Sequence, residues 1–441
     1  MNILRFTEQE FTQRLQAVVH HSSLFDPVIE ERARTIVEAV RTRGDAALLE
    51  LTERFDGAKL RADQLAVSAP EFLESSLQAT PHLRTMISAA ARNIELFSRK
   101  SLRRNWSTRN RQGGKVGEKF DPFQRVGVYI PGGTAPLVST CLMTILLARV
   151  AGCPEIVVCT PCSADGHINP SLLFAARTAG ATEVYRVGGA QAIAAMAYGT
   201  STIPRVQKVF GPGNAYVVAA KRLLFGLVAV DLLPGPSEVL VLADDSADAS
   251  FVAADLLAQA EHGSGHERVW LVTSSGKLLA AVAAEIEKQL PGLSRRSFIE
   301  STLRKNGWLI QVKSLQAGID LVNRLAPEHC EVMLRQPALA VGKIVSAGAI
   351  FVGPYAPTVL GDYVAGPSHT LPTGGGGQAF AGLTVDQFQR RTSVVEYSRS
   401  ALRQSLPVIQ TFAELEGLDA HSRSAAIRLD GARRTGRGPT R

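Results

Sequence analysis

The spacing of hydrophobic positions along this 441-residue chain changes near residue 126. Upstream, apolar residues recur at helical intervals over 28–55 and 72–97, which predicts a mainly helical region from 28 to 125 after a short helical arm at 1–24. Downstream, short runs rich in β-branched residues alternate with helical patterns. This alternation is typical of βαβ units, in which helices cover both faces of a parallel sheet.

The β-branched runs fall into two series, which predict two similar α/β halves. The first series lies at 126–130, 155–160, 183–187, 208–210 and 228–232, and the second at 238–243, 269–273, 308–312 and 349–352. Pro234, Gly235 and Pro236 separate the two series and mark a candidate boundary. Further on, a flexible glycine run at 374–377 precedes a helical pattern over 384–427, and such a linker lets a segment reach a partner chain.

One helical pattern of the second half carries polar residues at its end. It spans 246–262, with Ser246 as the expected N-cap and Gly263 as the expected stop. Its expected buried stripe consists of Phe251, Val252, Leu256 and Leu257. Because residues three apart share a helix face, Gln259 and His262 are expected to present an amide oxygen and an imidazole to one point.

Composition indicates a globular protein with large cores and more than one folding unit. Hydrophobic residues make up 45% of the chain and charged residues 20%. No uncharged apolar run is long enough to span a membrane, and the N-terminus lacks the apolar segment of a signal peptide. The five cysteines favour reduced thiols and a cytoplasmic location. Cys159 and Cys162 have C-x-x-C spacing without a second pair, which favours a structural role over a redox or zinc role.

The formal net charge of +8 raises the question of nucleic-acid binding. Much of the excess lies at 99–125 and in the tail at 433–441, whose composition predicts disorder. The first of these stretches lacks an interleaved aromatic platform beyond Trp106. The charge therefore favours a solvated basic surface, able to attract the phosphates of a cofactor, over a nucleic-acid site.

Glycine-rich turns follow three predicted strands of the first half. They contain Gly132 and Gly133, Gly188 and Gly189, and the segment 211–213 that precedes Asn214. Each turn leads into a helix, where free backbone N–H groups can meet a phosphate. None matches the G-x-G-x-x-G pattern of a standard dinucleotide site. Three such turns at the carboxyl ends of strands nevertheless favour a nucleotide or a similar cofactor over tight turns alone.

Acidic and histidine residues recur in separate islands later in the chain. Gln259, His262, Asp362 and His421 would supply two oxygens and two imidazole nitrogens, a mixed set that zinc accepts. Only the 259/262 pair is local, and an amide and a histidine that cap helix carbonyls are the commoner explanation of such a pair. Spacing alone leaves both alternatives open.

A second island consists of Glu328 and His329. Pro327 favours extended backbone at Ala326, which predicts that the pair lies at a junction between a helix and a strand. Both side chains can transfer protons near neutral pH, although a solvent-facing polar turn is the simpler explanation of an isolated pair. A third island, from Asp362 to His369, is rich in glycine and proline and predicts a loop that carries function.

These islands, in this order, resemble the L-histidinol dehydrogenase family from about residue 25 to residue 430. The stretches that carry the resemblance are VGVYIPGGTAPLVST (126–140), VGGAQAIAAMAYGT (187–200), FGPGNAYV (210–217), LLPGPSEVLVLAD (232–244), LLAQAEHG (256–263), APEHCEV (326–332), GDYVAGPSHTLPTGG (361–375) and EGLDAH (416–421). Ser368 and Cys330 stand where the family usually has Asn and Leu, and the Arg-rich tail beyond Leu429 is unusual for it.

The resemblance implies a zinc- and NAD-dependent enzyme of histidine biosynthesis, which oxidises L-histidinol to L-histidine through a bound aldehyde. It implies that His329 is the base, that Glu328 activates water and that zinc positions the substrate. The implied zinc ligands are Gln259, His262, Asp362 and His421, and the implied NAD contacts are Tyr129, Gln191 and Asn214. The implied substrate contacts are Ser237, His369 and Glu416, together with His329 and the zinc ligands.

The resemblance also implies a fold of two incomplete Rossmann-like parallel-sheet domains with small helical extensions at both ends. Residues 25–125 and 239–381 are then expected to form one α/β domain and residues 126–238 the NAD-binding domain. The helical segment 382–430 is expected to exchange with the partner subunit of a homodimer, so that Glu416 and His421 serve the partner's site.

Three other functions compete with this interpretation. A related zinc- and NAD-dependent dehydrogenase would act on another small amino alcohol or diol, but Glu416 is suited to an amine or imidazole. A zinc hydrolase that used Glu328 would leave the glycine turns without a role. A nucleic-acid binder would need more than the basic tail, so neither a nucleic-acid nor a membrane partner is expected.

Overall fold

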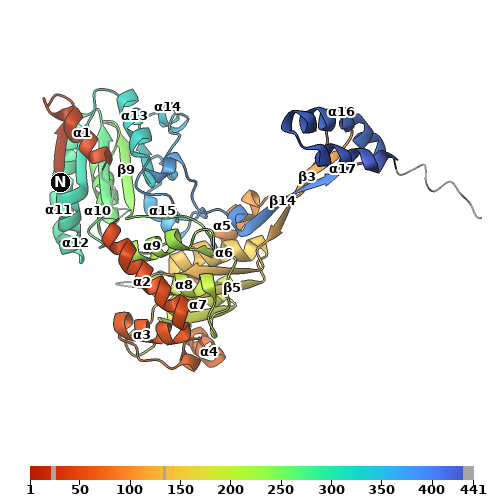
Figure 1. Ribbon diagram of the computed structural model, residues 1–441. Helices are drawn as coiled ribbons and strands as arrows, with labels where there is room; N and C mark the ends of the chain where they lie inside the picture. The colour runs from red at the N-terminus through yellow and green to blue at the C-terminus, as the bar shows by residue number, and fades with distance from the viewer. Residues whose placement is uncertain (21–25, 133–135, 431–441) are drawn as a thin grey trace, which may run out of the picture. The chain divides into compact units, whose positions relative to one another are not determined.

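The computed structural model describes residues 1–20, 26–132 and 136–430, and Figure 1 traces them. The chain forms two compact units, the first made of Met1–Ser101 and Phe123–Phe388 and the second of Leu102–Pro122 and Gln389–Arg441. No described helix is long and apolar enough to cross a membrane. The predicted disordered tail, 431–441, lies outside the described residues.

The first series of runs forms one parallel sheet in the first unit. Its strands are β4 (Arg125–Tyr129), β5 (Glu155–Thr160), β6 (Glu183–Arg186), β7 (Lys208–Phe210) and β8 (Ala229–Val230). They lie in the order β6-β5-β4-β7-β8, the doubly wound order of a nucleotide-binding sheet. The connecting helices are α6 (Val138–Ala151), α7 (Pro170–Ala179), α8 (Gly189–Tyr198) and α9 (Ala215–Leu224). The prediction for this half is confirmed.

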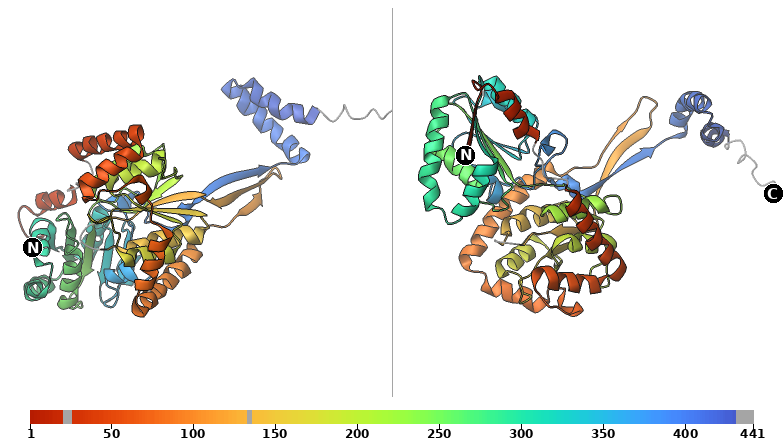
Figure 2. Two further views of the ribbon diagram at one scale, coloured as in Figure 1. Left: turned by 90° about the horizontal axis from the view of Figure 1, so that it is seen from below. Right: turned by 60° about the vertical axis from the view of Figure 1, so that its left-hand side comes forward.

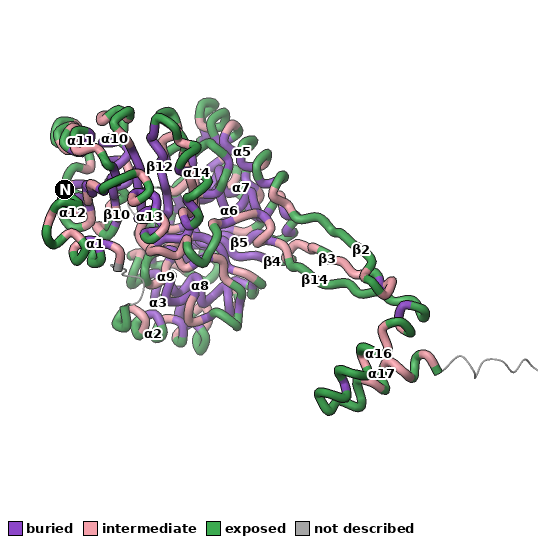
Figure 3. Tube along the Cα trace, turned by 90° about the horizontal axis from the view of Figure 1, so that it is seen from above, coloured by how far each residue is buried: buried purple, intermediate pink, exposed green. Residues whose placement is uncertain are grey.

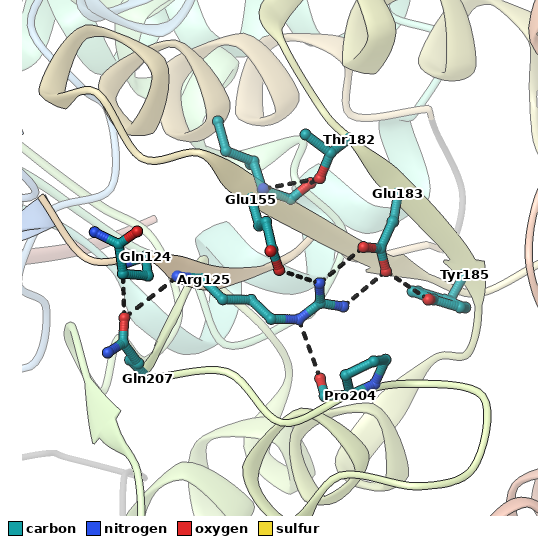
Figure 4. Close-up of polar contacts among 9 residues, drawn as sticks. Gln124, Arg125, Glu155, Thr182, Glu183, Tyr185, Pro204 and Gln207 are labelled. Carbon is teal, nitrogen blue, oxygen red and sulfur yellow. Dashed lines mark hydrogen bonds and ion pairs between the residues drawn. The ribbon is translucent and has the colours of Figure 1, made fainter.

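A charged clamp ties three strands of this sheet together at their amino ends (Figure 4). The guanidinium of Arg125 donates to both carboxylate oxygens of Glu183, at 2.8 and 2.7 Å, and to Glu155 at 2.6 Å. These three residues begin β4, β6 and β5. The paired guanidinium lowers the pKa of Glu183. The clamp therefore stabilises the edge of the sheet opposite to the glycine turns.

The second series forms a parallel sheet with the same strand order. It contains β9 (Glu238–Ala243), β10 (Arg268–Thr273), β11 (Gly307–Gln311), β12 (His329–Met333) and β13 (Ala349–Val352), in the order β11-β10-β9-β12-β13. The strand β12 is missing from the predicted series because His329 and Glu331 interrupt its apolar run. The N-terminal arm is not only helical: β1 (Asn2–Arg5) pairs with β11, and α1 (Phe11–His20) follows it.

Helices cover both faces of this second sheet, as the views in Figure 2 show. They are α10 (Ala249–Ala260), α11 (Gly276–Gln289), α12 (Arg296–Asn306), α13 (Leu315–Leu325), α14 (Ala338–Val341) and α15 (Thr358–Tyr363). Two apolar cores result, one on each face of the strands. Short 3-10 turns lie at Ala62–Gln64, Leu290–Gly292, Gly376–Gln378 and Val385–Phe388.

The N-terminal helices pack on the helices of the first sheet. They are α2 (Pro27–Arg43), α3 (Asp45–Asp56), α4 (Ala69–Gln78) and α5 (Pro81–Ser101). In this region α2 contacts α8 and α9, α4 contacts α7, and α5 contacts α6. Each of the two predicted helices, 28–55 and 72–97, is interrupted, at Gly44 with a φ of +53° and before Pro81.

The second unit is partly a sheet, where helices alone are predicted. Its strands β2 (Trp106–Arg109), β3 (Lys115–Pro122) and β14 (Gln389–Glu396) are antiparallel, and α16 (Arg399–Glu416) and α17 (Asp419–Asp430) follow. The mainly helical region predicted up to residue 125 therefore ends earlier, at Ser101, and the predicted helical pattern from 384 is wrong for the strand Gln389–Glu396. This unit buries little of its described surface (Figure 3), and large apolar side chains such as Val395, Phe412 and Leu415 are exposed.

Candidate active site

Two of the glycine turns meet at the carboxyl end of β4. The N–H of Gly189, the first residue of α8, donates to the hydroxyl of Tyr129 over 2.9 Å. Gly211 has a φ of +106°, and a Cβ there would collide with the backbone oxygen of Tyr129. Glycine is therefore required where these chain segments converge. The third turn, at 133–135, lies outside the described residues.

The predicted cofactor contacts line one cavity of about 1340 Å³ in the first unit. Tyr129, Gln191 and Asn214 all border it, together with Gly132 and Gly189. Asn214 is the N-cap of α9, because its side-chain oxygen accepts from the N–H groups of Tyr216 and Val217. Helices α2 and α3 add Arg32 and Arg54 to the wall. The cavity thus combines a helix N-terminus with guanidinium groups, an environment that suits phosphates.

Glu328 and His329 are buried at the start of β12, between α13 and the strand, as predicted. The backbone at Ala326 differs from the expectation: it is left-handed, with a φ of +45°, and ends α13. Nδ1–H of His329 donates to the backbone oxygen of Glu238 over 2.9 Å. This bond leaves Nε2 as an acceptor, and Nε2 is buried without a partner among the described residues.

Glu238, the first residue of β9, connects several parts of the site. Its N–H donates to Oε2 of Glu328 over 2.8 Å, and its own carboxylate accepts from the N–H of Gly374 and from Arg268. Burial raises the pKa of Glu328 well above its usual range. Burial also lowers the pKa of His329, which keeps its imidazole neutral.

Asp362 and His369 lie next to this pair. Oδ1 of Asp362 is 4.0 Å from Nε2 of His329 and 3.8 Å from Nδ1 of His369. His369 donates from Nδ1 to the backbone oxygen of Asp362 over 3.2 Å, and its Nε2 accepts from the Thr140 hydroxyl over 3.2 Å. Asp362 is in α15 rather than in the predicted loop, whereas His369 is in a loop. Because Thr140 is in α6, His369 connects the two α/β halves.

Gln259 ends the buried face of α10, and His262 follows in the next turn. The helix begins later than expected, at Ala249, with Asp248 as its N-cap, and it ends before Gly263. Of the predicted stripe, Phe251 is exposed, and Val252, Leu256 and Leu257 are buried. Nδ1–H of His262 donates to the backbone oxygen of Gln259 over 3.1 Å. Its Nε2 lone pair is thereby available, which is the orientation that metal-binding histidines usually have.

The remaining predicted site residues are Ser237, Glu416 and His421. Ser237 precedes β9, and its backbone oxygen accepts from the N–H of Arg268. Glu416 and His421 are exposed and belong to the second unit. No group of three His, Cys, Asp or Glu side chains in the described part of the chain could hold a metal by itself. Gln259, His262 and Asp362 belong to the first unit, and His421 belongs to the second.

The sequence interpretation missed Glu238, Thr140 and a buried carboxyl pair formed by Asp255 and Glu331. Acidic residues inside runs that are otherwise apolar, as in SEVLVLA and HCEVM, are a signal that could have found Glu238 and Glu331. Ser368 donates from its hydroxyl to the backbone oxygen of Met143. Cys330 is a buried free thiol.

Known proteins of one family match this chain over nearly its whole length. The family model described as histidinol dehydrogenase matches residues 20–429. The histidinol dehydrogenase of Geobacillus kaustophilus is 44% identical over 421 residues, which cover 95% of this chain and 99% of that protein. That of Heliobacterium mobile is 43% identical over 408 residues, or 92% of this chain and 95% of that protein.

A solved structure supports the same relationship. The crystal structure of histidinol dehydrogenase from Elizabethkingia anophelis superposes with a TM-score of 0.93 at 34% identity, covering 98% of this chain and 99% of that one. The match includes both parallel sheets, since it extends over almost every residue. On sequence and structure together, the chain belongs to the histidinol dehydrogenase family of oxidoreductases.

Proposed function

We propose that this protein oxidises L-histidinol to L-histidine in two successive steps. In the first, the alcohol carbon loses a hydride and its oxygen loses a proton, which gives the aldehyde. In the second, water adds to the aldehyde, and loss of another hydride and of two protons gives the carboxylate. Two NAD⁺ accept the two hydrides. The observation that carries the proposal is the buried His329, whose Nε2 is an unpartnered acceptor in a chain of this family.

His329 is the base in this proposal. Its Nδ1–H is engaged by the backbone of Glu238, so the ring is held in one tautomer and Nε2 is the atom that can accept the alcohol proton. Within the described ranges of the chain, Nε2 has no protein partner, which leaves that atom for the substrate.

Glu328 activates the water that attacks the aldehyde. Its Oε2 is held by the N–H of Glu238 and lies 3.5 Å from Nδ1 of His329. The two side chains leave the backbone at consecutive positions, so each can face a different part of a bound substrate. Ser237, His369 and Glu416 are proposed to contact that substrate as well.

Zinc would be held by Gln259, His262, Asp362 and His421. The donor set fits the metal: two oxygens and two imidazoles suit a borderline ion, and the backbone bond of His262 presents Nε2. When bound, the ion supplies a positive charge that orients the substrate's imidazole and amine.

NAD would occupy the cavity bordered by Tyr129, Gln191 and Asn214. Its volume of about 1340 Å³ accommodates a dinucleotide, and the N-terminus of α9 and the side chains of Arg32 and Arg54 offer donors to phosphates.

A homodimer with exchanged second units would complete each site. The exposed apolar side chains of the second unit are suited to burial against a partner, and Glu416 and His421 are exposed. The five buried free thiols are compatible with a reducing, cytoplasmic setting.

The test is the number of NADH molecules formed per L-histidinol consumed by the zinc-loaded protein. About two NADH per histidinol, the count that a four-electron oxidation through NAD requires, supports both steps. One NADH with release of the aldehyde would contradict the second step. NAD binding without turnover, together with oxidation of another amino alcohol or diol, would assign the substrate to the rival dehydrogenase.

A substitution separates the two proposed roles. Glu328→Gln keeps the size of the side chain but removes the base, so oxidation of supplied aldehyde should decrease more than oxidation of histidinol. Equal losses in both half-reactions would contradict the assignment of water activation to Glu328.

A further inference from the structure

A pair of buried carboxyl groups lies beneath the proposed site and takes no part in the mechanism above. Glu331 on β12 is 1% exposed, and Asp255 on α10 is 9% exposed. Each carboxyl group shifts the pKa of the other through a side-chain hydrogen-bonding contact, which places the two side chains next to each other. Two carboxylates offer only acceptors, so such a bond requires a proton on one of them. Oε2 of Glu331 has no other partner among the described residues, which is consistent with a shared proton.

The surroundings favour Glu331 as the residue that carries the proton. Burial raises the pKa of Glu331 to about 9 and that of Asp255 to about 6, and repulsion by Asp255 contributes to the former. At neutral pH the pair is therefore one neutral acid bonded to one carboxylate.

Glu331 makes a second, well-defined bond to a third element. Its Oε1 accepts the N–H of Thr358 over 2.8 Å in a buried environment. Thr358 is the first residue of the short helix α15. One side chain on β12 is thus bonded to α10 on one side and to α15 on the other.

Each of these elements carries a residue of the proposed site a short step away. Gln259 lies one helical turn beyond Asp255 on α10, and Asp362 one turn beyond Thr358 on α15. His329 lies two residues before Glu331, on the same face of β12. Each of the three positions therefore lies within four residues of a proposed site residue on the same element.

We infer that Glu331 is a positioning residue: together with Asp255 and the N–H of Thr358, it holds α10, β12 and α15 in the arrangement that places Gln259, His329 and Asp362 around one substrate. The inference rests on the proposed function for the roles of those three residues. Apolar packing alone would allow the elements to slide, whereas directional hydrogen bonds in a low-dielectric interior fix their register.

Three variants test this inference. Glu331→Gln preserves both bonds, because its carbonyl oxygen can accept from Thr358 and its amide can donate to Asp255. Glu331→Leu removes both while keeping a buried side chain. Val332→Ala is the matched control, because Val332 is in the same strand but is buried in the core on the other face.

The readouts are zinc affinity by competition with a chelator, hydrogen exchange of the backbone amides in 358–363, and kcat/KM. Glu331→Leu should weaken zinc affinity and kcat/KM about 10- to 100-fold, as loss of an outer partner of a metal site does, and should speed exchange in 358–363. Glu331→Gln should stay within about threefold of wild type, since its hydrogen bonds are retained. Val332→Ala should lower the melting temperature while leaving zinc affinity near that of the wild type.

The inference is overturned if Glu331→Gln loses as much as Glu331→Leu, or if Glu331→Leu matches Val332→Ala in zinc affinity and exchange. If Glu331→Leu does not fold, Asp255→Asn and Asp255→Ala decide: the amide can donate to Glu331 and the methyl cannot, so equal zinc affinities would overturn the inference. If the wild type binds no zinc, the metal part of the proposed function fails. Hydrogen exchange in 358–363 then still tests the positioning role. The role is supported if Glu331→Leu speeds this exchange and Glu331→Gln and Val332→Ala do not.

Discussion

The two parallel sheets of the first unit share one strand order but carry their polar sites at opposite edges. In the first sheet Tyr129, Gly189 and Asn214 lie at or after the carboxyl ends of β4, β6 and β7. In the second sheet Glu238 and His329 begin β9 and β12, so the site lies at the amino ends of the strands. Strand order alone predicts a ligand at the carboxyl edge in both cases.

The difference follows from which helix ends gather at each edge. The carboxyl edge of the first sheet receives the N-termini of α8 and α9, whose free N–H groups favour phosphates. The amino edge of the second sheet receives the C-termini of α10 and α13, whose carbonyl groups favour cations. One architecture used at opposite edges thus offers an anion-binding site and a cation-binding site within a single unit.

Replacing His329 gives the largest expected contrast between the two edges. His329→Ala removes the proposed base, so kcat should fall about 10²- to 10⁴-fold, the usual contribution of a general base. NAD affinity should not change, because the cavity at the first sheet is intact. Steady-state kinetics and calorimetric titration with NAD measure both. A fall in kcat of less than tenfold would refute the assignment of the base.

Removing a proposed metal ligand tests the cation-binding edge. His262→Asn should weaken zinc affinity by at least about 10- to 100-fold, the usual effect of losing a residue that only hydrogen-bonds a metal ligand. The far-ultraviolet circular dichroism should not change, because the fold is kept. His266→Asn, in the exposed loop that follows, is the matched control and should keep its zinc. Full activity of His262→Asn in metal-free buffer would rule out the zinc role.

Two N-cap substitutions, one in a helix of each sheet, should have a similar cost in stability. Asn214→Ala and Asp248→Ala each remove a side-chain oxygen that accepts backbone N–H groups, at the start of α9 and α10. Each should lower the free energy of unfolding by about 1 kcal/mol. Only Asn214→Ala should also raise the KM for NAD. Equal KM values for NAD in the two variants would show that the N-cap of α9 does not contribute to cofactor binding.

A further difference between the two sheets concerns the pH dependence of stability. Burial raises the pKa of Glu331 to about 9 from its ordinary value near 4.5, so the folded state holds a proton that the unfolded chain releases. This contribution to stability is complete below the unfolded pKa and is lost as pH rises toward the folded pKa. Glu331→Gln has no such proton. Its unfolding free energy should therefore decrease less than that of the wild type between about pH 5 and about pH 9, by up to ~1.4 kcal/mol per pH unit.

The first sheet should not share this behaviour at its charged clamp. Arg125 lowers the pKa of Glu183 instead of raising it, so this carboxylate loses its stabilising effect only in acid. Urea unfolding at several pH values, compared between wild type and Glu331→Gln, measures the difference. Parallel curves for the two proteins would show that Glu331 does not hold the extra proton.

Much of the fold could be predicted because its signals are local. Short β-branched runs bounded by turns predicted nine of the ten strands β4 to β13 within a few residues, since buried parallel strands need continuous apolar side chains. The strand β12 was not predicted because His329 and Glu331 interrupt that apolar pattern. The hairpin in the second unit was not predicted because its strands are exposed and therefore have no apolar face in the sequence.

By itself, the sequence determined the two α/β halves, the placement of Gly188 and Gly189 and of Gly211 before helices, and, through family resemblance, the candidate residues of the site. Tertiary structure alone decided that the N-terminal helices pack against the first sheet's helices, that His329 donates to Glu238, and that Asp255 and Glu331 are buried next to each other. The physical reason is range. Hydrophobic period and turn chemistry act between near neighbours in the chain, whereas burial and hydrogen bonding depend on segments that only folding brings together.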